Sequence, residues 1–327
     1  FPYKPSIFHN AGAGLIGGLV FGIGLVVLRE RADRTIQSPG ETAYYLNVPE
    51  LGVIPAVASD RDNSYRRREL AAKFTDPKDQ NGDRHLTDCV ELVTLKRRPS
   101  MVAESFRAAL ASILFSESSV IVFSSSAPSE GKTTVLSNLG VAMAETHRRV
   151  LLIDADLRKP RLHHIFDVAN ARGLSDLLRS EKPLDDFRPE DLIQETGVNG
   201  LSILPSGPEA ASISDLLYSA RLPELLKHVR AKFDVVLIDT PPMLQMPDAR
   251  ILGRMADGVI LIVRAGNTTR DTMLVATQRF VEDGTPVLGT ILNNWNPKTR
   301  AADGYQGYYK GYQAYYGSNN GKDRASG

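Results

Sequence analysis

The sequence of 327 residues has a single cysteine, Cys89, so it has no disulfide framework and fits a reducing compartment. The chain also has no excess of charge of one sign, because its 39 lysines and arginines are balanced by 38 aspartates and glutamates. A chain this close to neutral has no global attraction to nucleic acid, and we expect no nucleic-acid partner. No internal repeat is visible. The length fits about two domains, and the 42% of hydrophobic residues are ample for a core.

One long uncharged run lies near the N-terminus, at Ala11–Leu28. As a helix it would be about 27 Å long, just enough to cross the hydrocarbon core of a bilayer. Lys4 is the one charged residue before it, whereas Arg29, Arg31 and Arg34 follow at once. Because positive charges favour the cytoplasmic side, this pattern predicts a transmembrane helix over 11–28 whose chain continues into the cytoplasm, with 1–10 as its periplasmic end.

Two alternatives to a membrane helix are weaker. A buried core helix would be poor with six glycines in eighteen residues, and no methionine or cleavage-type site marks a signal peptide. Gly14, Gly18 and Gly22 share one helix face, which allows close approach of a neighbouring helix. The sequence begins with Phe1 rather than methionine, and we interpret it as a fragment of a longer chain.

Residues 29–100 are predicted to form a cytoplasmic juxtamembrane linker, because prolines and polar stretches interrupt any periodicity. The basic run Arg66–Arg68 either contacts anionic lipid headgroups or belongs to a solvated linker. The short apolar segment Leu51–Pro55 is interpreted as an edge strand or a docking segment.

Residues 101–296 alternate between strand and helix patterns, which predicts a mostly parallel α/β sheet covered by helices on both faces. The strands are expected at 120–124, 150–154, 201–204, 234–239, 258–263 and 287–292. The helices are expected at 103–114, 132–146, 174–179, 213–219, 221–231 and 270–282.

The loop after the first of these strands is typical of a phosphate-binding loop. It contains Ser129-Glu130-Gly131-Lys132-Thr133-Thr134 and opens a helix. Backbone N–H groups at a helix start bind phosphate oxygens, a lysine adds positive charge, and a threonine hydroxyl binds Mg²⁺. The leading glycine of the pattern is replaced by Ser126. A chance match at a helix start is the alternative.

Carboxylates end two further apolar strands. Asp154 and Asp156 follow Val150–Ile153, and Asp239 follows Val235–Ile238. Ligands bind at the carboxyl ends of parallel strands, so we expect these acids and the loop to meet around one magnesium–nucleotide. An acid at a strand end is often only a helix cap, and that alternative stays open for Asp154 and Asp156.

The C-terminal segment 297–327 is predicted to be a flexible, tyrosine-rich tail. Six tyrosines in a glycine-rich setting cannot pack a core and are candidate phosphoryl acceptors: Tyr305, Tyr308, Tyr309, Tyr312, Tyr315 and Tyr316. Full phosphorylation would add on the order of −10 charges and repel copies of the tail in an oligomer. A low-complexity tail without chemistry is the alternative.

These motifs together resemble the bacterial tyrosine kinases of polysaccharide co-polymerases. The resemblance is carried by the loop 125–133, by Leu151–His163, by Leu237–Pro242 and by the tyrosine tail. It implies a P-loop NTPase fold, ATP and Mg²⁺ as cofactors, and autophosphorylation of the tail tyrosines that regulates exopolysaccharide polymerisation, chain length and export. It also implies a bacterial inner-membrane protein with a cytoplasmic kinase domain, a homo-oligomer, and contact with the polymerase and export machinery.

Each motif residue then has an expected role. Residues 129–134, including Lys132, would bind the phosphates. Asn293 would read the adenine edge or, as is common for amides at strand ends, only cap a turn. Thr133, Asp156 and Asp239 would hold Mg²⁺. Asp154 would take the tyrosine proton or orient the hydroxyl, and Arg158 would neutralise charge at the γ-phosphate or anchor its loop. Positioning and charge neutralisation do most of the work in such a transfer.

The sequence departs from the family pattern in three places. The proline-rich family segment after Ser206-Gly207-Pro208 is absent and is replaced by Glu209–Ser212. Ser129 replaces the first glycine of the family loop, and Leu110 replaces the second arginine of an oligomerisation helix whose Glu104 and Arg107 match. Alternatives of other classes are a membrane-associated P-loop ATPase of the positioning or partition type, and a nucleotide-binding scaffold of the export assembly without significant tyrosine transfer.

Overall fold

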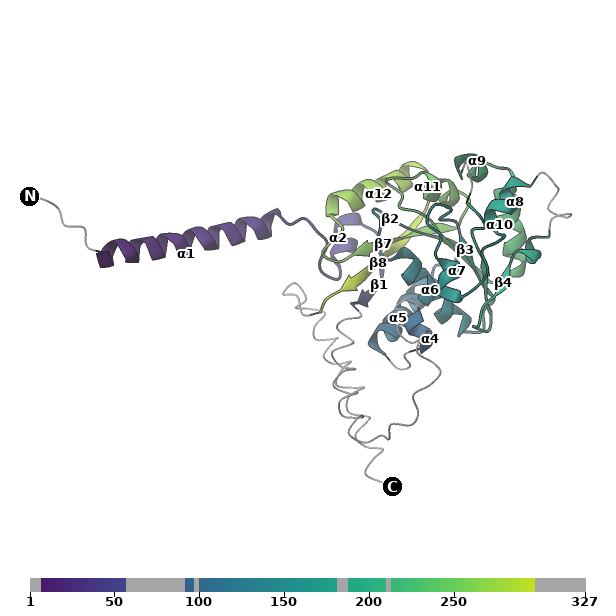
Figure 1. Cartoon of the computed structure of the whole chain (residues 1–327), viewed down its shortest axis with the longest axis horizontal. Coiled ribbons are helices and arrows are strands. Elements are labelled where there is room, and N and C mark those ends of the chain that lie inside the picture. Colours follow the sequence, from purple (N-terminus) through teal and green to yellow (C-terminus); the bar gives the residue numbers. More distant parts are fainter. Residues whose placement is uncertain (1–6, 57–91, 97–99, 181–187, 210–212, 298–327) are drawn as a thin grey trace, which may run out of the picture. The chain divides into compact units, whose positions relative to one another are not determined.

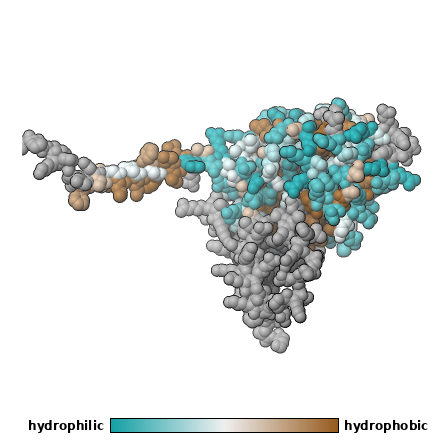
Figure 2. All heavy atoms as spheres, viewed as in Figure 1, coloured by the Kyte–Doolittle hydropathy of each residue, from teal (hydrophilic) through white to brown (hydrophobic). Residues whose placement is uncertain are grey.

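The computed structural model of the chain describes residues 7–56, 92–96, 100–180, 188–209 and 213–297. The chain divides into two units, one up to Thr35 and one from Ile36 onward. The first unit contains helix α1, Ile7–Ala32, whose span Ala11–Arg29 has a mean hydropathy of 2.3 and is long and apolar enough to cross a membrane. Exposed apolar side chains recur along this helix, between pale glycine positions (Figure 2).

The second unit is built on a sheet of eight strands in the order β1-β8-β7-β2-β6-β3-β5-β4 (Figure 1). All neighbouring strands run parallel except the β4–β5 pair. The strands are β1 Glu50–Pro55, β2 Val120–Ser125, β3 Val150–Asp154, β4 Gln194–Glu195, β5 Leu201–Leu204, β6 Val235–Asp239, β7 Gly258–Arg264 and β8 Val287–Trp295.

Helices cover both faces of the sheet because the central strands are apolar on both sides. One face packs against α2 Glu41–Leu46, α8 Leu174–Arg179, α9 Ile213–Leu217, α10 Arg221–Lys232, α11 Asp248–Gly253 and α12 Arg270–Glu282. The other face packs against α4 Val93–Lys96, α5 Met101–Leu114, α6 Lys132–Ala144 and α7 Leu162–Phe166. A short 3₁₀ helix, η2, spans Pro189–Asp191. Val122 and Phe123 show the alternation, since each lies in the core of a different face.

The fold class and the six strands predicted from the sequence are confirmed, with ends that shift by at most a few residues. Helix α5 begins two residues earlier than predicted because the Ser100 hydroxyl caps it by accepting a hydrogen bond from the Ala103 N–H at 3.0 Å.

The predicted linker over 29–100 needs a correction at both ends, since Leu92 and Val93 at its C-terminal end are buried in the core of the second unit. Residues Ile36–Ala56 belong to the compact second unit, and β1 pairs with β8 as the edge strand. Val53 and Ile54 are buried in the cores of opposite sheet faces, so burial of apolar area holds this segment on the domain. The edge-strand interpretation of Leu51–Pro55 is thus confirmed. The predicted linker residues 57–91, including Arg66–Arg68, lie outside the described residues.

Candidate functional site

The candidate site lies at the carboxyl ends of β2, β3 and β6, where the loop between β2 and α6 crosses the rim of the sheet. Gly131 immediately precedes α6 with φ 93°, a left-handed conformation that glycine adopts without strain. A Cβ at Gly131 would lie 2.1 Å from the Asn293 side-chain nitrogen, so a larger residue there would have to displace this amide. Ser129, which stands where the family has glycine, takes a left-handed φ of 62° as well.

Glu130 stabilises this loop from within. Its side chain is fully buried and accepts hydrogen bonds from the Ser126 hydroxyl at 3.1 Å, from the Ala127 N–H at 3.0 Å and from the Thr268 hydroxyl. A buried carboxylate needs such donors, because an unpaired one would be costly. Glu130 was predicted to bind the cofactor; the structure directs its carboxylate into the protein, where it organises the loop.

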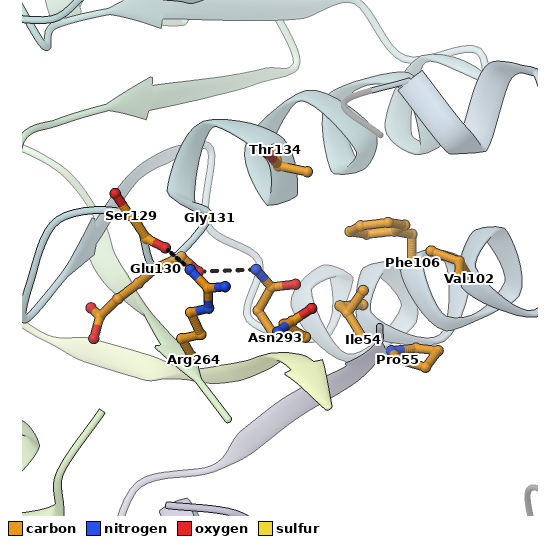
Figure 3. Close-up of a pocket in the computed structure, with 11 residues that line it drawn as sticks. Ile54, Pro55, Val102, Phe106, Ser129, Glu130, Gly131, Thr134, Arg264 and Asn293 are labelled. Atoms are coloured by element: carbon orange, nitrogen blue, oxygen red, sulfur yellow. Dashed lines mark hydrogen bonds between the residues drawn. The ribbon is translucent and has the colours of Figure 1, made fainter. Parts of the chain in front are cut away.

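Two residues from neighbouring strands hold the loop backbone (Figure 3). The Arg264 guanidinium at the end of β7 donates to the Ser129 carbonyl at 2.8 Å. The Asn293 amide of β8 donates to the Glu130 carbonyl at 2.9 Å. The sequence pointed to Asn293 but missed Arg264 and Thr268, because neither belongs to a recognisable motif. We call Arg264, Thr268 and Asn293 the loop clamp.

Thr133 and Lys132 begin α6 and lie beside an acid of β6. The Thr133 hydroxyl donates to Asp239 Oδ2 at 2.6 Å. Lys132 is largely buried, and its charge lies close enough to lower the pKa of Asp239. The phosphate loop and the end of β6 therefore meet, as the motifs predicted.

Asp154 and Asp239 are partners in the parallel pairing of β3 and β6. Burial raises the pKa of Asp239 to about 6, although the Thr133 hydroxyl and the Lys132 charge lower it. Burial, and then the charge of Asp239, raise the pKa of Asp154 well above its usual value. Two buried carboxyl groups side by side thus favour a shared proton or a cation.

Asp154 performs a structural role with one of its oxygens. Its Oδ2 accepts from the backbone N–H groups of Arg161 and Leu162, both at 3.0 Å, at the start of α7. Its Oδ1 is buried and makes no hydrogen bond to the described residues. The helix-cap alternative therefore holds for one oxygen and leaves the other for a ligand.

Asp156 and Arg158 lie on the loop after β3. Asp156 is half-buried and accepts from the Lys159 N–H at 3.0 Å, and its charge acts on both Asp154 and Asp239. The Arg158 guanidinium lies 3.6 Å from the buried carboxylate of Asp248 at the start of α11. Asp248 was not predicted from the sequence, since nothing near it forms a motif.

The donor set fits Mg²⁺. It combines the Thr133 hydroxyl with carboxylate oxygens, and Asp239 Oδ1 is buried without a hydrogen bond to the described residues. Among the described residues no three His, Cys, Asp or Glu side chains are grouped to hold an ion alone. That suits Mg²⁺, which takes one or two carboxylates and completes its shell with phosphate oxygens and water.

A pocket opens on the far side of the loop (Figure 3). It has a volume of about 180 Å³. Ile54, Val102 and Phe106 give it an apolar wall, and Thr134 and Asn293 contribute polar groups. An apolar slot with a few polar groups is the usual form of a small-molecule site.

Leu110 stands where the family pattern has a second arginine, and its burial explains why a leucine fits at this position. It is buried in the core under α5, so this position faces the protein's own interior. Arg107 forms ion pairs with Glu104 at 2.5 Å and with Glu145 at 3.3 Å in the same chain.

The six candidate acceptor tyrosines, Tyr305 to Tyr316, lie outside the described residues.

Comparison with known proteins identifies relatives of this site. The family model described as an AAA domain matches residues 118–279. The tyrosine-protein kinase Etk of Escherichia coli (strain K12) is 29% identical over 93% of this chain, which spans 41% of that relative. The tyrosine-protein kinase YwqD of Bacillus subtilis (strain 168) is 32% identical over 66% of this chain and 91% of its own length.

A solved structure agrees with these sequence matches. The kinase domain of Escherichia coli tyrosine kinase ETK superposes with a TM-score of 0.65 at 27% identity, covering 79% of this chain and 95% of the other. The fold, the phosphate loop with its facing acids and the match to nearly all of YwqD lead to one conclusion. This chain belongs to the family of bacterial tyrosine-protein kinases.

Proposed function

We propose that the protein is an ATP-dependent protein-tyrosine autokinase that phosphorylates the tyrosines of its own C-terminal segment. The observation that carries this proposal is the meeting of Lys132 and Thr133 with Asp239 and Asp154 at one rim of the sheet. The family membership supports the same chemistry.

The nucleotide would bind across the loop. The N–H groups of residues 129–134 and Lys132 hold the phosphates, and the adenine enters the pocket beside Asn293. The Asn293 amide retains a second N–H and its oxygen for the base edge, beyond the hydrogen bond it makes to Glu130. Thr133, Asp156 and Asp239 hold Mg²⁺, which when bound neutralises charge on the phosphate oxygens.

In the transfer step the tyrosine oxygen attacks the γ-phosphorus of ATP. A new P–O bond forms to tyrosine, the bond from the γ-phosphorus to the bridging oxygen breaks, and ADP leaves with that electron pair. The phenol proton passes to Asp154, whose raised pKa suits it to receive one. Arg158 lies on the same loop as Asp156 and neutralises charge at the γ-phosphate.

We further propose that α1 anchors the protein in the bacterial inner membrane with the kinase domain in the cytoplasm. Phosphorylation of the tail would make it strongly negative and loosen a homo-oligomer by repulsion. In this way the modification would regulate polymerisation, chain length and export of an exopolysaccharide through the machinery that the protein joins.

The test is phosphotyrosine formation after ATP and Mg²⁺ are added to the purified full chain in detergent. Lys132→Met should abolish the label, whereas the control Lys227→Met, on an exposed position of α10, should keep it. Full phosphotyrosine on the Lys132→Met protein would refute the proposal. ATP hydrolysis without any phosphotyrosine would instead indicate a P-loop ATPase.

A mixing experiment identifies the acceptor and the direction of transfer. A Lys132→Met chain with its tail is combined with an active chain that lacks residues 298–327. We expect label on the inactive chain, because a glycine-rich segment of this length, if it behaves as a random coil, would reach about 20 Å and so a neighbouring copy. Label that remains when all six tail tyrosines are replaced by phenylalanine would place the acceptor elsewhere.

A further inference from the structure

Asp248 is an unusual buried acid beside the proposed site. It is the first residue of α11 and its side chain is fully buried. Neither Oδ1 nor Oδ2 makes a hydrogen bond to the described residues. A buried carboxylate without donors is costly, because it loses its water shell and gains little in return. Its presence therefore calls for a function that the fold alone does not supply.

The partner that the structure offers to this acid is Arg158. The Arg158 Nη2 atom lies 3.6 Å from Asp248 Oδ1, within ion-pair range but too far for a hydrogen bond. The Arg158 side chain remains 32% exposed, so the guanidinium is anchored on one side and accessible on the other. Since this contact is not bidentate, most of its five N–H donors are uncommitted to Asp248.

The pair lies next to the acids of the site. Arg158 is two residues beyond Asp156 on the loop after β3, and the charge of Asp156 acts on Asp248. The charges that face Asp248 thus come from Arg158 and Asp156, two positions of one loop. The loop that carries Arg158 follows β3, whose carboxyl end is paired with the end of β6 where Thr133 meets Asp239.

We propose that Asp248 is a positioning residue that holds the Arg158 guanidinium in place for the γ-phosphate of the bound nucleotide. This inference rests on the proposed kinase function and adds a residue to it. A long arginine side chain on a loop samples many rotamers, and a fixed negative charge beneath it restricts these before the nucleotide arrives. The arrangement stabilises charge that develops on the transferring group without binding ADP more tightly.

A purely structural role is the competing explanation, because an acid in the first turn of a helix interacts favourably with the helix dipole. The variant Asp248→Asn distinguishes the positioning role from the structural role. It keeps the shape of the side chain and removes its charge. In a structural role, Asp248→Asn lowers thermal stability and leaves the response to the γ-phosphate unchanged.

The test compares the binding of ADP with the binding of ADP plus aluminium fluoride, which mimics the transferring phosphoryl group, to the full chain with Mg²⁺. We expect Asp248→Asn to leave the Kd for ADP within about twofold and to weaken the aluminium fluoride complex about tenfold. The kcat for phosphotyrosine formation should fall by a similar factor at nearly constant KM for ATP.

The double variant decides whether Asp248 acts through Arg158. In an Arg158→Ala background, Asp248→Asn should cause no further loss, because the group that it positions is gone. Arg158→Lys should be impaired about as much as Arg158→Ala, since a lysine does not present the same planar donors. Losses that multiply in the double variant would overturn the proposal, and so would an Asp248→Asn protein with unchanged aluminium fluoride binding.

A matched control uses a second aspartate–arginine pair. Asp257, whose Oδ1 lies 2.8 Å from Arg230 Nη1, directly precedes β7 and so lies at the amino ends of the strands, opposite the carboxyl ends that form the site. Asp257→Asn should lower thermal stability and leave the aluminium fluoride complex intact. If Lys132→Met retained phosphotyrosine, the kinase function would fail; if only the Asp248→Asn result failed, the kinase function would stand and the positioning role would not.

Discussion

Asp154 and Asp239 occupy partner positions at the ends of β3 and β6, and each has one carboxylate oxygen that makes no hydrogen bond to the described residues. Both side chains are buried, so neither charge is screened by water. Two such acids side by side form an unfavourable pair of charges, which binding of a cation and a nucleotide would relieve. The site is organised for its ligand at the expense of stability, as functional sites often are.

The first prediction concerns the pH dependence of stability without nucleotide. The folded pKa of Asp239, about 6, lies above the unfolded value of about 4. Between these two pH values the folded protein retains a proton that the unfolded chain loses, so the free energy of unfolding decreases as the pH rises. Asp154→Asn should weaken this decrease and stabilise the protein at pH 7.5, because it removes a buried acid whose pKa is raised by burial and by the charge of Asp239. Urea unfolding of the parent and of Asp154→Asn at pH 4 and at pH 7.5 measures the free energies of unfolding that test this.

Asp257→Asn is the matched control, with the opposite sign. Burial alone would raise the pKa of Asp257, but hydrogen bonds from the Val120 N–H and from Ser119, together with Arg230, lower it. The variant should therefore be less stable than the parent at pH 7.5, and the deficit should shrink below about pH 4. An Asp154→Asn protein that is destabilised at pH 7.5 would contradict the account of the site.

The second prediction uses the left-handed conformation of Ser129. Its φ of 62° costs a residue with a Cβ about 1 kcal/mol relative to glycine, and its side chain is exposed. Ser129→Gly should raise the free energy of unfolding by up to about 1 kcal/mol and preserve ATP affinity. Denaturant titration measures the stability. Ser129→Ala, which keeps the Cβ, should leave stability nearly unchanged.

The third prediction is that Gly131→Ala abolishes nucleotide binding. The added methyl group would collide with the Asn293 amide, which holds the Glu130 carbonyl, and the φ of 93° is unfavourable for alanine. Gly284→Ala is the control, because Gly284 has a φ of 70° but open space around its Cβ position. Only the first variant should lose ATP binding by calorimetry. Equal binding losses in both would assign the effect to backbone strain alone.

The fourth prediction tests the loop clamp. Thr268→Val removes the hydroxyl that donates to the buried Glu130 carboxylate and accepts from the Arg264 N–H. A buried charge that loses a donor should cost about 2 kcal/mol of stability, and the loosened loop should bind ATP about tenfold more weakly. Thr290→Val is the control, since the Thr290 hydroxyl is buried without a hydrogen bond to the described residues, and its removal should be neutral or stabilising.

The sequence alone determined the elements whose signal is local. Each central strand is an apolar run with a turn or acid after it, and the phosphate loop is contiguous, so both could be recognised without a structure. Parallel strands place their carboxyl ends at one edge, and this rule alone predicted that Thr133 and Asp239 would meet.

The tertiary structure decided what depends on partners distant in the chain. Arg264, Thr268 and Asp248 have no motif around them, and their roles come from contacts with residues about 90 or more positions away. The sequence placed Ile36–Ala56 in a linker and left Leu51–Pro55 open between an edge strand and a docking segment, because a six-residue strand carries little pattern of its own. Pairing with β8 and burial on the core decided for the edge strand and placed the whole segment in the domain. Local sequence encodes which elements form, whereas packing chooses which side chains stabilise them.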